Sequence, residues 1–503
     1  MLASVQSSSV IGVSGTAVGV EVHVSNGLPG LTVVGLPDTA CREARDRVRA
    51  AILSSKFEWP LQRITVNLAP SGVRKSGAGL DVAIALGVLV ASEQLEPRCT
   101  EHMAFIGELG LDGSIRSVPG LVPMLSVIDA ATAVVPAAGL GEALVAAPHA
   151  RGVHHLRELV DALKGNEPWP DPDPLPCVVA DDDGLDLSEI RGQSWARRAL
   201  EIAAAGGHHL LMFGPPGSGK TMLAERLPTL LAPLEGPLAL EVTSVHSAAG
   251  ERAGRPGLVR QPPFRHPHHS ASAVALIGGG SHQLRPGEVS LAHGGVLFLD
   301  ELGEFPVTVL DALRQPLEDG CVRISRAHAS ATLPARFQLI AAMNPCPCGF
   351  AGYGRCRCTF ASVNRYTRRV SGPLLDRFDL RISVEPPSAI ELFGAARGES
   401  SADVAERIAV ARRRAADRGV RANNELSASA MERCSELVGK APTMLSDAVS
   451  DGRLSARGVR RVRTVALTID DLAGGDGRLG PDRVAEAMQM RADVVPLTPR
   501  MTA

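Results

Sequence analysis

One stretch of the sequence has the residue types and the spacing needed to bind phosphate groups. Gly214, Gly219 and Lys220-Thr221 fit the pattern G-x-x-x-x-G-K-[ST], which here follows an apolar strand and opens a helix. Glycines let phosphate oxygens approach backbone N–H groups, and the helix N-terminus adds a favourable dipole. We therefore expect Lys220 to reach the β- and γ-phosphates of ATP and the Thr221 hydroxyl to bind Mg²⁺. The whole loop comprises Gly214, Pro215, Pro216, Gly217, Ser218, Gly219, Lys220 and Thr221.

A second stretch supplies the carboxylates that hydrolysis would need. Residues 296–299 form a continuous apolar run, which is typical of a strand buried in a parallel sheet. Asp300 and Glu301 should emerge at the carboxyl end of this strand, where such sheets bind ligands. We interpret Asp300 as the Mg²⁺ partner and Glu301 as the base that orients and deprotonates water. A further core strand, residues 337–343, ends at Asn344, which we expect to sense the γ-phosphate and the attacking water.

The composition places these motifs in an ordinary globular chain. Its 503 residues are too many for a single core and indicate two or three domains. The chain is 45% hydrophobic and 21% charged with a formal net charge of −2, so any binding of nucleic acid would have to come from local patches. No apolar run reaches membrane-spanning length, and the first residues lack a signal-peptide pattern. We therefore expect a cytoplasmic protein without membrane contact.

Residues 1–165 are expected to form a first domain that mixes strands and helices. Residues 20–24 alternate as a half-buried strand and are expected to pair with residues 31–34 across a glycine-rich turn. These segments resemble the Lon-protease-like domain that also ends the RadA recombination proteins and has the ribosomal-protein-S5-like fold. Gly77 stands where that family has its serine nucleophile, and Val122 stands near the place of its lysine. Without a hydroxyl and an amine the site cannot run this catalysis, so we interpret the domain as a non-proteolytic scaffold that offers a surface to a protein partner.

The remaining chain is predicted to divide into a linker, an ATPase core and a helical lid. Residues 166–186 are rich in proline and aspartate, a composition that stiffens and extends a linker. Residues 187–395 contain the phosphate loop and are expected to form an α/β core with a parallel sheet. Residues 396–503 show a helical pattern interrupted by glycine and proline, which predicts a small C-terminal helical unit.

Basic and histidine side chains gather on three loops. Residues 318–334 are predicted to be two strands around a basic tip with Arg323, Arg326 and His328. This place corresponds to the DNA-touching hairpin of the replicative MCM helicases, although a solvated turn explains the same residues equally well. The histidines of residues 263–270 lack partners at metal-ligand spacing, so we expect them to line a pore or a subunit contact. The basic loop around Lys75 is expected to be solvated.

Four of the nine cysteines are packed into one short segment. Cys346, Cys348, Cys356 and Cys358 form a C-x-C…C-x-C pattern on a loop rich in glycine and arginine. Four thiolates this close could hold one tetrahedral Zn²⁺ ion as a structural site. However, C-x-C is a less usual ligand pair than C-x-x-C, and reduced cysteines are expected in a cytosol. A zinc site and a group of free thiols both stay open at the level of the sequence.

Together these motifs resemble one family over nearly the whole chain. The phosphate loop and residues 294–302, 344–349, 372–379 and 455–458 are similar to the magnesium-chelatase-like AAA+ ATPases of the YifB/ComM group. The resemblance implies an α/β P-loop core with a C-terminal helical lid, with ATP and Mg²⁺ as cofactors. It also implies a ring assembly, which we expect to be a homo-hexamer.

The same resemblance implies roles for two arginines and for the motor as a whole. Arg377 matches an arginine finger that acts on the nucleotide of a neighbouring subunit, and Arg457 matches the second sensor arginine, acting in cis. By similarity to this group, the motor would be a DNA translocase that drives branch migration in recombination or transformation. Two alternatives stay open: a protein-remodelling or regulatory ATPase and, with less support, a magnesium chelatase motor subunit.

Overall fold

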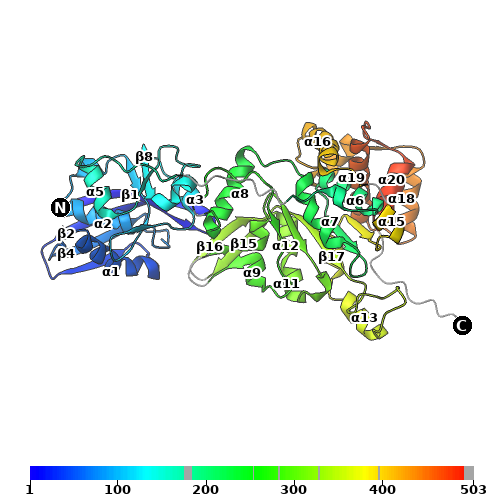
Figure 1. Ribbon diagram of the computed structural model, residues 1–503, viewed down its shortest axis with the longest axis horizontal. Coiled ribbons are helices and arrows are strands. Elements are labelled where there is room, and N and C mark those ends of the chain that lie inside the picture. Colours follow the sequence, from blue (N-terminus) through cyan, green and yellow to red (C-terminus); the bar gives the residue numbers. More distant parts are fainter. Residues whose placement is uncertain (175–183, 253, 281–283, 327–328, 395–396, 492–503) are drawn as a thin grey trace.

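In a computed structural model, the chain folds into three parts that lie in a row (Figure 1). The structure describes residues 1–174, 184–252, 254–280, 284–326, 329–394 and 397–491. The N-terminal part lies at one end, the part with the phosphate loop lies in the middle, and the C-terminal helices lie at the other end. Within these ranges, every helix is too short or too polar to cross a membrane.

A seven-stranded sheet forms the centre of the N-terminal part. Its order is β3-β4-β2-β1-β5-β8-β9, in which β2 runs antiparallel to both neighbours and all other pairs are parallel. The expected pairing of residues 20–24 with residues 31–34 is wrong, because β4 lies between β2 and β3. The strands are β1 (Leu2–Ile11), β2 (Ser14–Ser25), β3 (Gly30–Val34), β4 (Arg63–Ala69), β5 (Met103–Phe105), β8 (Thr132–Pro136) and β9 (Arg151–Val153), with a small hairpin of β6 (Glu108–Leu109) and β7 (Ile115–Arg116).

Helices pack on both faces of this sheet. Val5 and Val10 are five positions apart, so their side chains point to opposite faces of β1, and they belong to different apolar clusters. The first cluster lies under α2, whose residues are all buried, and the second lies under α3. The helices are α1 (Thr39–Ser54), α2 (Asp81–Ala91), α3 (Leu121–Leu125), α4 (Leu140–Ala143) and α5 (Leu156–Leu163).

The loop before α2 differs from the sequence-based expectation. Lys75 is fully buried, and its ammonium group donates hydrogen bonds to the carbonyl oxygens of Pro70 and, at 2.7 Å, Val73. The prediction of a solvated basic loop is therefore wrong for this side chain, whose charge is stabilised by carbonyl dipoles instead of water.

A five-stranded parallel sheet forms the middle part. Its order is β11-β14-β17-β10-β18, so β10, which precedes the phosphate loop, lies between β17 and β18. The strands are β10 (Leu210–Phe213), β11 (Phe264–Arg265), β14 (Val296–Leu299), β17 (Gln338–Met343) and β18 (Leu380–Ser383). The helices are α6 (Ser194–Gly206), α7 (Lys220–Arg226), α8 (Gly236–Ala249), α9 (Ala273–Ile277), α10 (Glu288–Leu291), α11 (Val307–Ala312), α12 (Arg314–Asp319), α13 (Phe360–Thr367), α14 (Gly372–Leu375) and α15 (Ala389–Gly394).

Two hairpins accompany the middle part, and one of them contacts the N-terminal part. They are β12 (Gly278–Gly279) with β13 (Arg285–Pro286), and β15 (Cys321–Arg326) with β16 (Ala329–Pro334). A Cβ atom added at Gly12 would lie 2.9 Å from side-chain atoms of Ala331 and Leu333, so the β1–β2 turn rests directly on β16. A second contact joins α3 to α8, where the backbone N–H of Gly120 donates to the carbonyl of Ser247 at 2.9 Å.

The C-terminal helices share an apolar cluster with the middle part. Val404 and Ile408 of α16 and Val462 of α19 pack in one cluster with α6 and β10. This common core fixes the C-terminal helices against the nucleotide-binding sheet. They are α16 (Ser401–Asp417), α17 (Ala428–Cys434), α18 (Ala441–Ser450), α19 (Ala456–Leu472) and α20 (Pro481–Gln489), with the short strands β19 (Glu436–Leu437) and β20 (Arg478–Leu479).

Candidate functional site

The predicted phosphate loop connects β10 to α7. Gly217 and Gly219 have φ angles of +76° and +82°, a conformation that side-chain-bearing residues rarely adopt, so the glycines are needed for this turn. Lys220 is only 7% exposed, and its ammonium group donates to the carbonyl oxygens of Gly214 and Pro215 at 2.9 and 2.8 Å. Burial lowers the pKa of Lys220, and the nearby carboxylate of Asp300 opposes this shift. The loop therefore presents a partly desolvated positive charge beside its backbone.

Three neighbouring strands bring the other predicted residues to the same edge of the sheet. Asp300 follows β14 and Asn344 follows β17, so both emerge at the carboxyl ends of parallel strands. The Thr221 hydroxyl donates to Asp300 Oδ2 at 2.7 Å, and Lys220 Nζ lies 3.3 Å from Asn344 Oδ1. Hydroxyl and carboxylate oxygens are ligands that Mg²⁺ prefers, so Thr221 and Asp300 fit a magnesium site.

Glu301 has a partner that the sequence did not indicate. His269 Nδ1 lies 3.1 Å from Glu301 Oε2, within hydrogen-bond distance. Glu301 also adopts a φ angle of +51°, which is unusual for a residue with a side chain. The segment of residues 263–270 was expected to line a pore or a subunit contact, whereas its last histidine contacts the predicted catalytic base. Only the position of His269 shortly after β11, beside β14, could have suggested this contact.

The predicted arginine finger lies at the opposite edge of the sheet from the phosphate loop. Arg377 precedes β18, whose first residue Leu380 pairs with Leu210, the first residue of β10. The phosphate loop follows the last residue of β10, a strand of four residues that spans about 13 Å at about 3.3 Å per residue. Arg377 forms an ion pair with Glu318 and has a side chain that is 11% exposed. It therefore lies away from the phosphate loop of its own chain.

Arg457 lies near Arg377. Burial, followed by the positive charges of Arg457 and Arg461, lowers the pKa of Arg377. Arg461, one helical turn after Arg457 on α19, donates to the carbonyl of Arg377 at 2.9 Å and pairs with the buried carboxylate of Asp379. Burial alone would raise the pKa of Asp379, but His208, whose Nδ1 lies 3.6 Å from Asp379 Oδ2, and the charge of Arg461 hold it below its usual range. These contacts fasten α19 to the start of β18.

The segment before α6 touches the phosphate loop from another side. Gln193 donates through Nε2 to the carbonyl oxygens of Ser218 at 2.5 Å and Glu385 at 3.2 Å. Gln193 thereby ties the phosphate loop to the segment that follows β18.

The predicted DNA-binding hairpin is formed by β15 and β16. Arg323 is exposed, with 66% of its side chain accessible, and forms an ion pair of 3.6 Å with Asp319. Such an exposed pair is weak, so the guanidinium stays available to a phosphate. Arg326 ends β15 at the tip of the hairpin, while its side chain and His328 lie outside the described residues.

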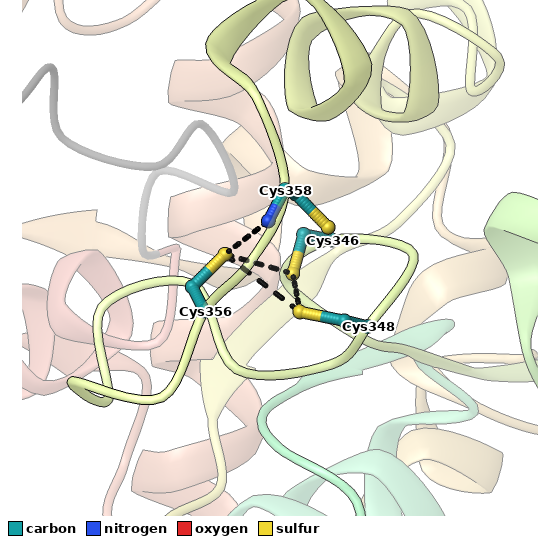
Figure 2. Close-up of side chains that lie close together, drawn as sticks. All are labelled: Cys346, Cys348, Cys356 and Cys358. Atoms are coloured by element: carbon teal, nitrogen blue, oxygen red, sulfur yellow. Dashed lines mark hydrogen bonds between the residues drawn. The ribbon is translucent and has the colours of Figure 1, made fainter.

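The four clustered cysteines converge on one point (Figure 2). The Sγ atoms of Cys346, Cys348 and Cys356 lie 3.3 to 3.7 Å apart, and all four Sγ atoms, including that of Cys358, lie within 4.8 Å of one another. All four residues are free cysteines. Hydrogen bonds from the backbone of Arg357 and Phe350 and from Cys346 lower the pKa of Cys348 to about 6.

Comparison with known proteins places this site in a family. The model of magnesium chelatase subunit ChlI matches residues 186–392, a second ChlI model matches residues 20–138, and the model of the ChlI C-terminal region matches residues 398–491. A Mycobacterium tuberculosis protein is 45% identical over 494 residues, which cover 96% of this chain and 97% of the relative. Protein YifB of Escherichia coli is 42% identical over 497 residues (98% and 97%), and competence protein ComM of Haemophilus influenzae is 43% identical over 506 residues (98% of each).

Proposed function

The chain belongs to the magnesium-chelatase-like AAA+ ATPase family that includes YifB and ComM, and we propose that it is an ATP-hydrolysing ring motor that moves branched DNA. The arrangement of the nucleotide site is the basis for the first half of this proposal. The second half rests on the exposed hairpin of β15 and β16 and on the relationship to a competence protein.

The chemistry is divided among the residues at the carboxyl edge of the sheet. Lys220 offers its charge to the phosphates of ATP, and Asn344 Oδ1 orients that ammonium group. Thr221 and Asp300 would hold Mg²⁺, which neutralises phosphate charge when bound. Glu301 accepts the proton of the attacking water after its carboxylate leaves His269. The chain thus contains the parts needed to bind ATP and activate water, but its finger arginine lies at the other edge of the sheet.

We infer a ring assembly from this separation of Arg377 from the phosphate loop of the same chain. An arginine at the amino ends of the strands can complete a nucleotide site only on a neighbouring subunit. Arg461, which donates to the carbonyl of Arg377, lies one helical turn after Arg457 on α19, so α19 holds Arg457 on the same side of the molecule as Arg377. We therefore assign both arginines to the neighbour's nucleotide, in place of the cis role that the sequence suggested for Arg457. Head-to-tail contacts of this kind close into a ring, for which we propose six subunits.

The hairpin of β15 and β16 supports DNA as the moving substrate. Arg323 is exposed on it, and Arg326 stands at its tip, so neighbouring copies of the hairpin would line a ring with positive charge. Contacts to phosphate are independent of sequence, as a translocating motor requires, and they weaken as salt rises. The β1–β2 turn of the N-terminal part contacts this hairpin at Ala331 and Leu333 of β16.

Steady-state ATP hydrolysis tests the proposal. The full chain is assayed without DNA, with single-stranded DNA and with a four-way junction, at two salt concentrations. We expect stimulation by DNA that is strongest with the junction and falls with salt, and that is lost in Arg323→Ala. The matched control is Arg453→Ala, which removes an exposed arginine between α18 and α19, outside the hairpin. If the rate of ATP hydrolysis is the same with and without each DNA, the chain is not a DNA motor, although the proposed ATPase activity would still hold.

A further inference from the structure

The loop between β17 and α13 is long and irregular. It runs from Asn344 to Thr359 with neither helix nor strand, and its residues from Phe350 onward are half-buried or exposed. Segments of this length inside a compact domain are uncommon unless they serve a function. The loop brings its four cysteines together (Figure 2).

The spacing of the sulfur atoms matches a single tetrahedral metal ion. Zinc–sulfur bonds of about 2.3 Å place the sulfur atoms of a tetrahedron about 3.8 Å apart. The measured separations are 3.3, 3.7 and 3.7 Å among the first three sulfur atoms, and all four fall within 4.8 Å. Backbone N–H groups of Ala351 and Cys358 donate to the sulfur atoms of Cys346 and Cys356 at 3.3 and 3.4 Å, and such hydrogen bonds orient ligands toward a metal ion.

We propose that these four cysteines bind one Zn²⁺ ion as thiolates, and that the ion holds the loop carrying Asn344 against the phosphate loop. Binding requires all four cysteines as thiolates and leaves a unit with two negative charges, which the adjacent Arg355 and Arg357 offset in part. Four soft sulfur ligands in a tetrahedron select zinc over magnesium or calcium. An iron–sulfur cluster contains several metal atoms and would hold its cysteine sulfurs farther apart than a single ion does.

The loop also contacts the nucleotide site directly. A Cβ atom added at Gly349 would lie 2.5 Å from ring atoms of Pro216, so the cysteine loop and the phosphate loop are in close contact. Cys346 is fully buried and stands two residues after Asn344. On the other side, the Tyr353 hydroxyl donates to Glu385 Oε1 at 2.9 Å, and the carbonyl of Glu385 accepts from Gln193. A metal ion at the cysteines would therefore fix Asn344 from one side and the phosphate loop from the other.

Metal content and metal spectroscopy test the site without reference to activity. The full chain is purified without chelator, and zinc is measured by atomic emission for the wild type, for Cys356→Ser/Cys358→Ser and for the control Cys434→Ser. Cys434 is a half-buried cysteine outside the loop. We expect about one zinc per chain in the wild type and control and less than about a tenth of that in the double variant. Cobalt-substituted wild type should show the visible bands of a tetrahedral cobalt thiolate.

The second part of the proposal, that zinc holds Asn344 against the phosphate loop (the bracing role), rests on the proposed ATPase activity. It is tested by the rate of ATP hydrolysis with and without zinc. Stripping zinc from the wild type should lower ATP hydrolysis about 10- to 100-fold, the cost of misplacing a catalytic group by about 1 Å, and added zinc should restore it. If the wild-type protein lacks stoichiometric zinc, or contains iron instead, the proposed zinc site is wrong, whether or not the protein hydrolyses ATP. Full hydrolysis by the stripped protein would overturn the bracing role. A zinc-loaded protein that never hydrolyses ATP would instead refute the proposed function.

Discussion

Removal of the His269 side chain is expected to accelerate basal ATP hydrolysis. The imidazole lies 3.1 Å from Glu301 Oε2, and a carboxylate oxygen engaged there cannot at the same time accept a proton from water. The side chains of His269 and Glu301 are 35% and 49% exposed, so solvent screens the pair. Pairs of this kind contribute about 0.2 to 1 kcal/mol. Releasing Glu301 should therefore raise the rate about 1.4- to 5-fold at 25 °C.

The assay is steady-state hydrolysis by His269→Ala at saturating ATP and Mg²⁺ without DNA. His266→Ala is the matched control, because His266 lies on the same segment and packs against Phe298, with ring centroids 4.7 Å apart, instead of contacting Glu301. A fall of tenfold or more in His269→Ala would refute the reasoning, since it would make His269 a participant in the chemistry. An unchanged rate would also refute it, because the contact would then impose no cost on Glu301.

Three further predictions concern the arginine edge and the magnesium site. Asp379→Ala should destabilise the chain by about 3–5 kcal/mol in urea unfolding, because it leaves Arg461, whose side chain is only 17% exposed, without its carboxylate partner. The exposed pair of Asp451 should contribute less than about 1 kcal/mol. Because the pKa of Asp379 is held below its usual range, Asp379 should stabilise the folded chain above about pH 4, and this stabilisation should be lost as the pH falls further. Acid unfolding of the wild type and of Asp379→Ala measures the difference. Thr221→Val should raise the Mg²⁺ concentration needed for half-maximal hydrolysis and leave the fold intact; an unchanged requirement would remove Thr221 from the site. Arg377→Ala and Lys220→Ala should each be inactive alone, and equal mixtures should regain up to about a quarter of the sites if the finger acts in trans; mixtures without activity would contradict that arrangement.

The nucleotide site was largely predictable because its residues are set by local sequence. A glycine pattern between a strand and a helix fixes the phosphate loop, and polar residues directly after apolar strands must lie at one edge of a parallel sheet. Asp300 and Asn344 follow this rule, and in the structure they contact Thr221 and Lys220. The helical pattern of residues 396–503 also predicts a C-terminal part made of helices, as the structure has it.

Contacts between distant segments were not predictable in the same way. The turn at residues 26–30 predicts a local hairpin, but β4, which lies more than thirty residues later, pairs with both strands. Lys75 is buried because carbonyl groups of its own loop surround the ammonium group, which no pattern of charges reveals. His269 meets Glu301, and Arg457 lies near Arg377, because the sheet order and the packing of α19 bring them together. Such contacts depend on tertiary packing, to which a single sequence gives little access.

The central claim is that ATP hydrolysis on this ring moves branched DNA. The most direct measurement follows a labelled four-way junction as it is converted into two duplexes by the full chain, with ATP and Mg²⁺. We predict conversion by the wild type and none by Glu301→Gln, which should still bind ATP but hydrolyse it about 10²- to 10⁴-fold more slowly. Conversion that proceeds equally in Glu301→Gln, or a wild type that hydrolyses ATP and leaves the junction intact, would contradict the account.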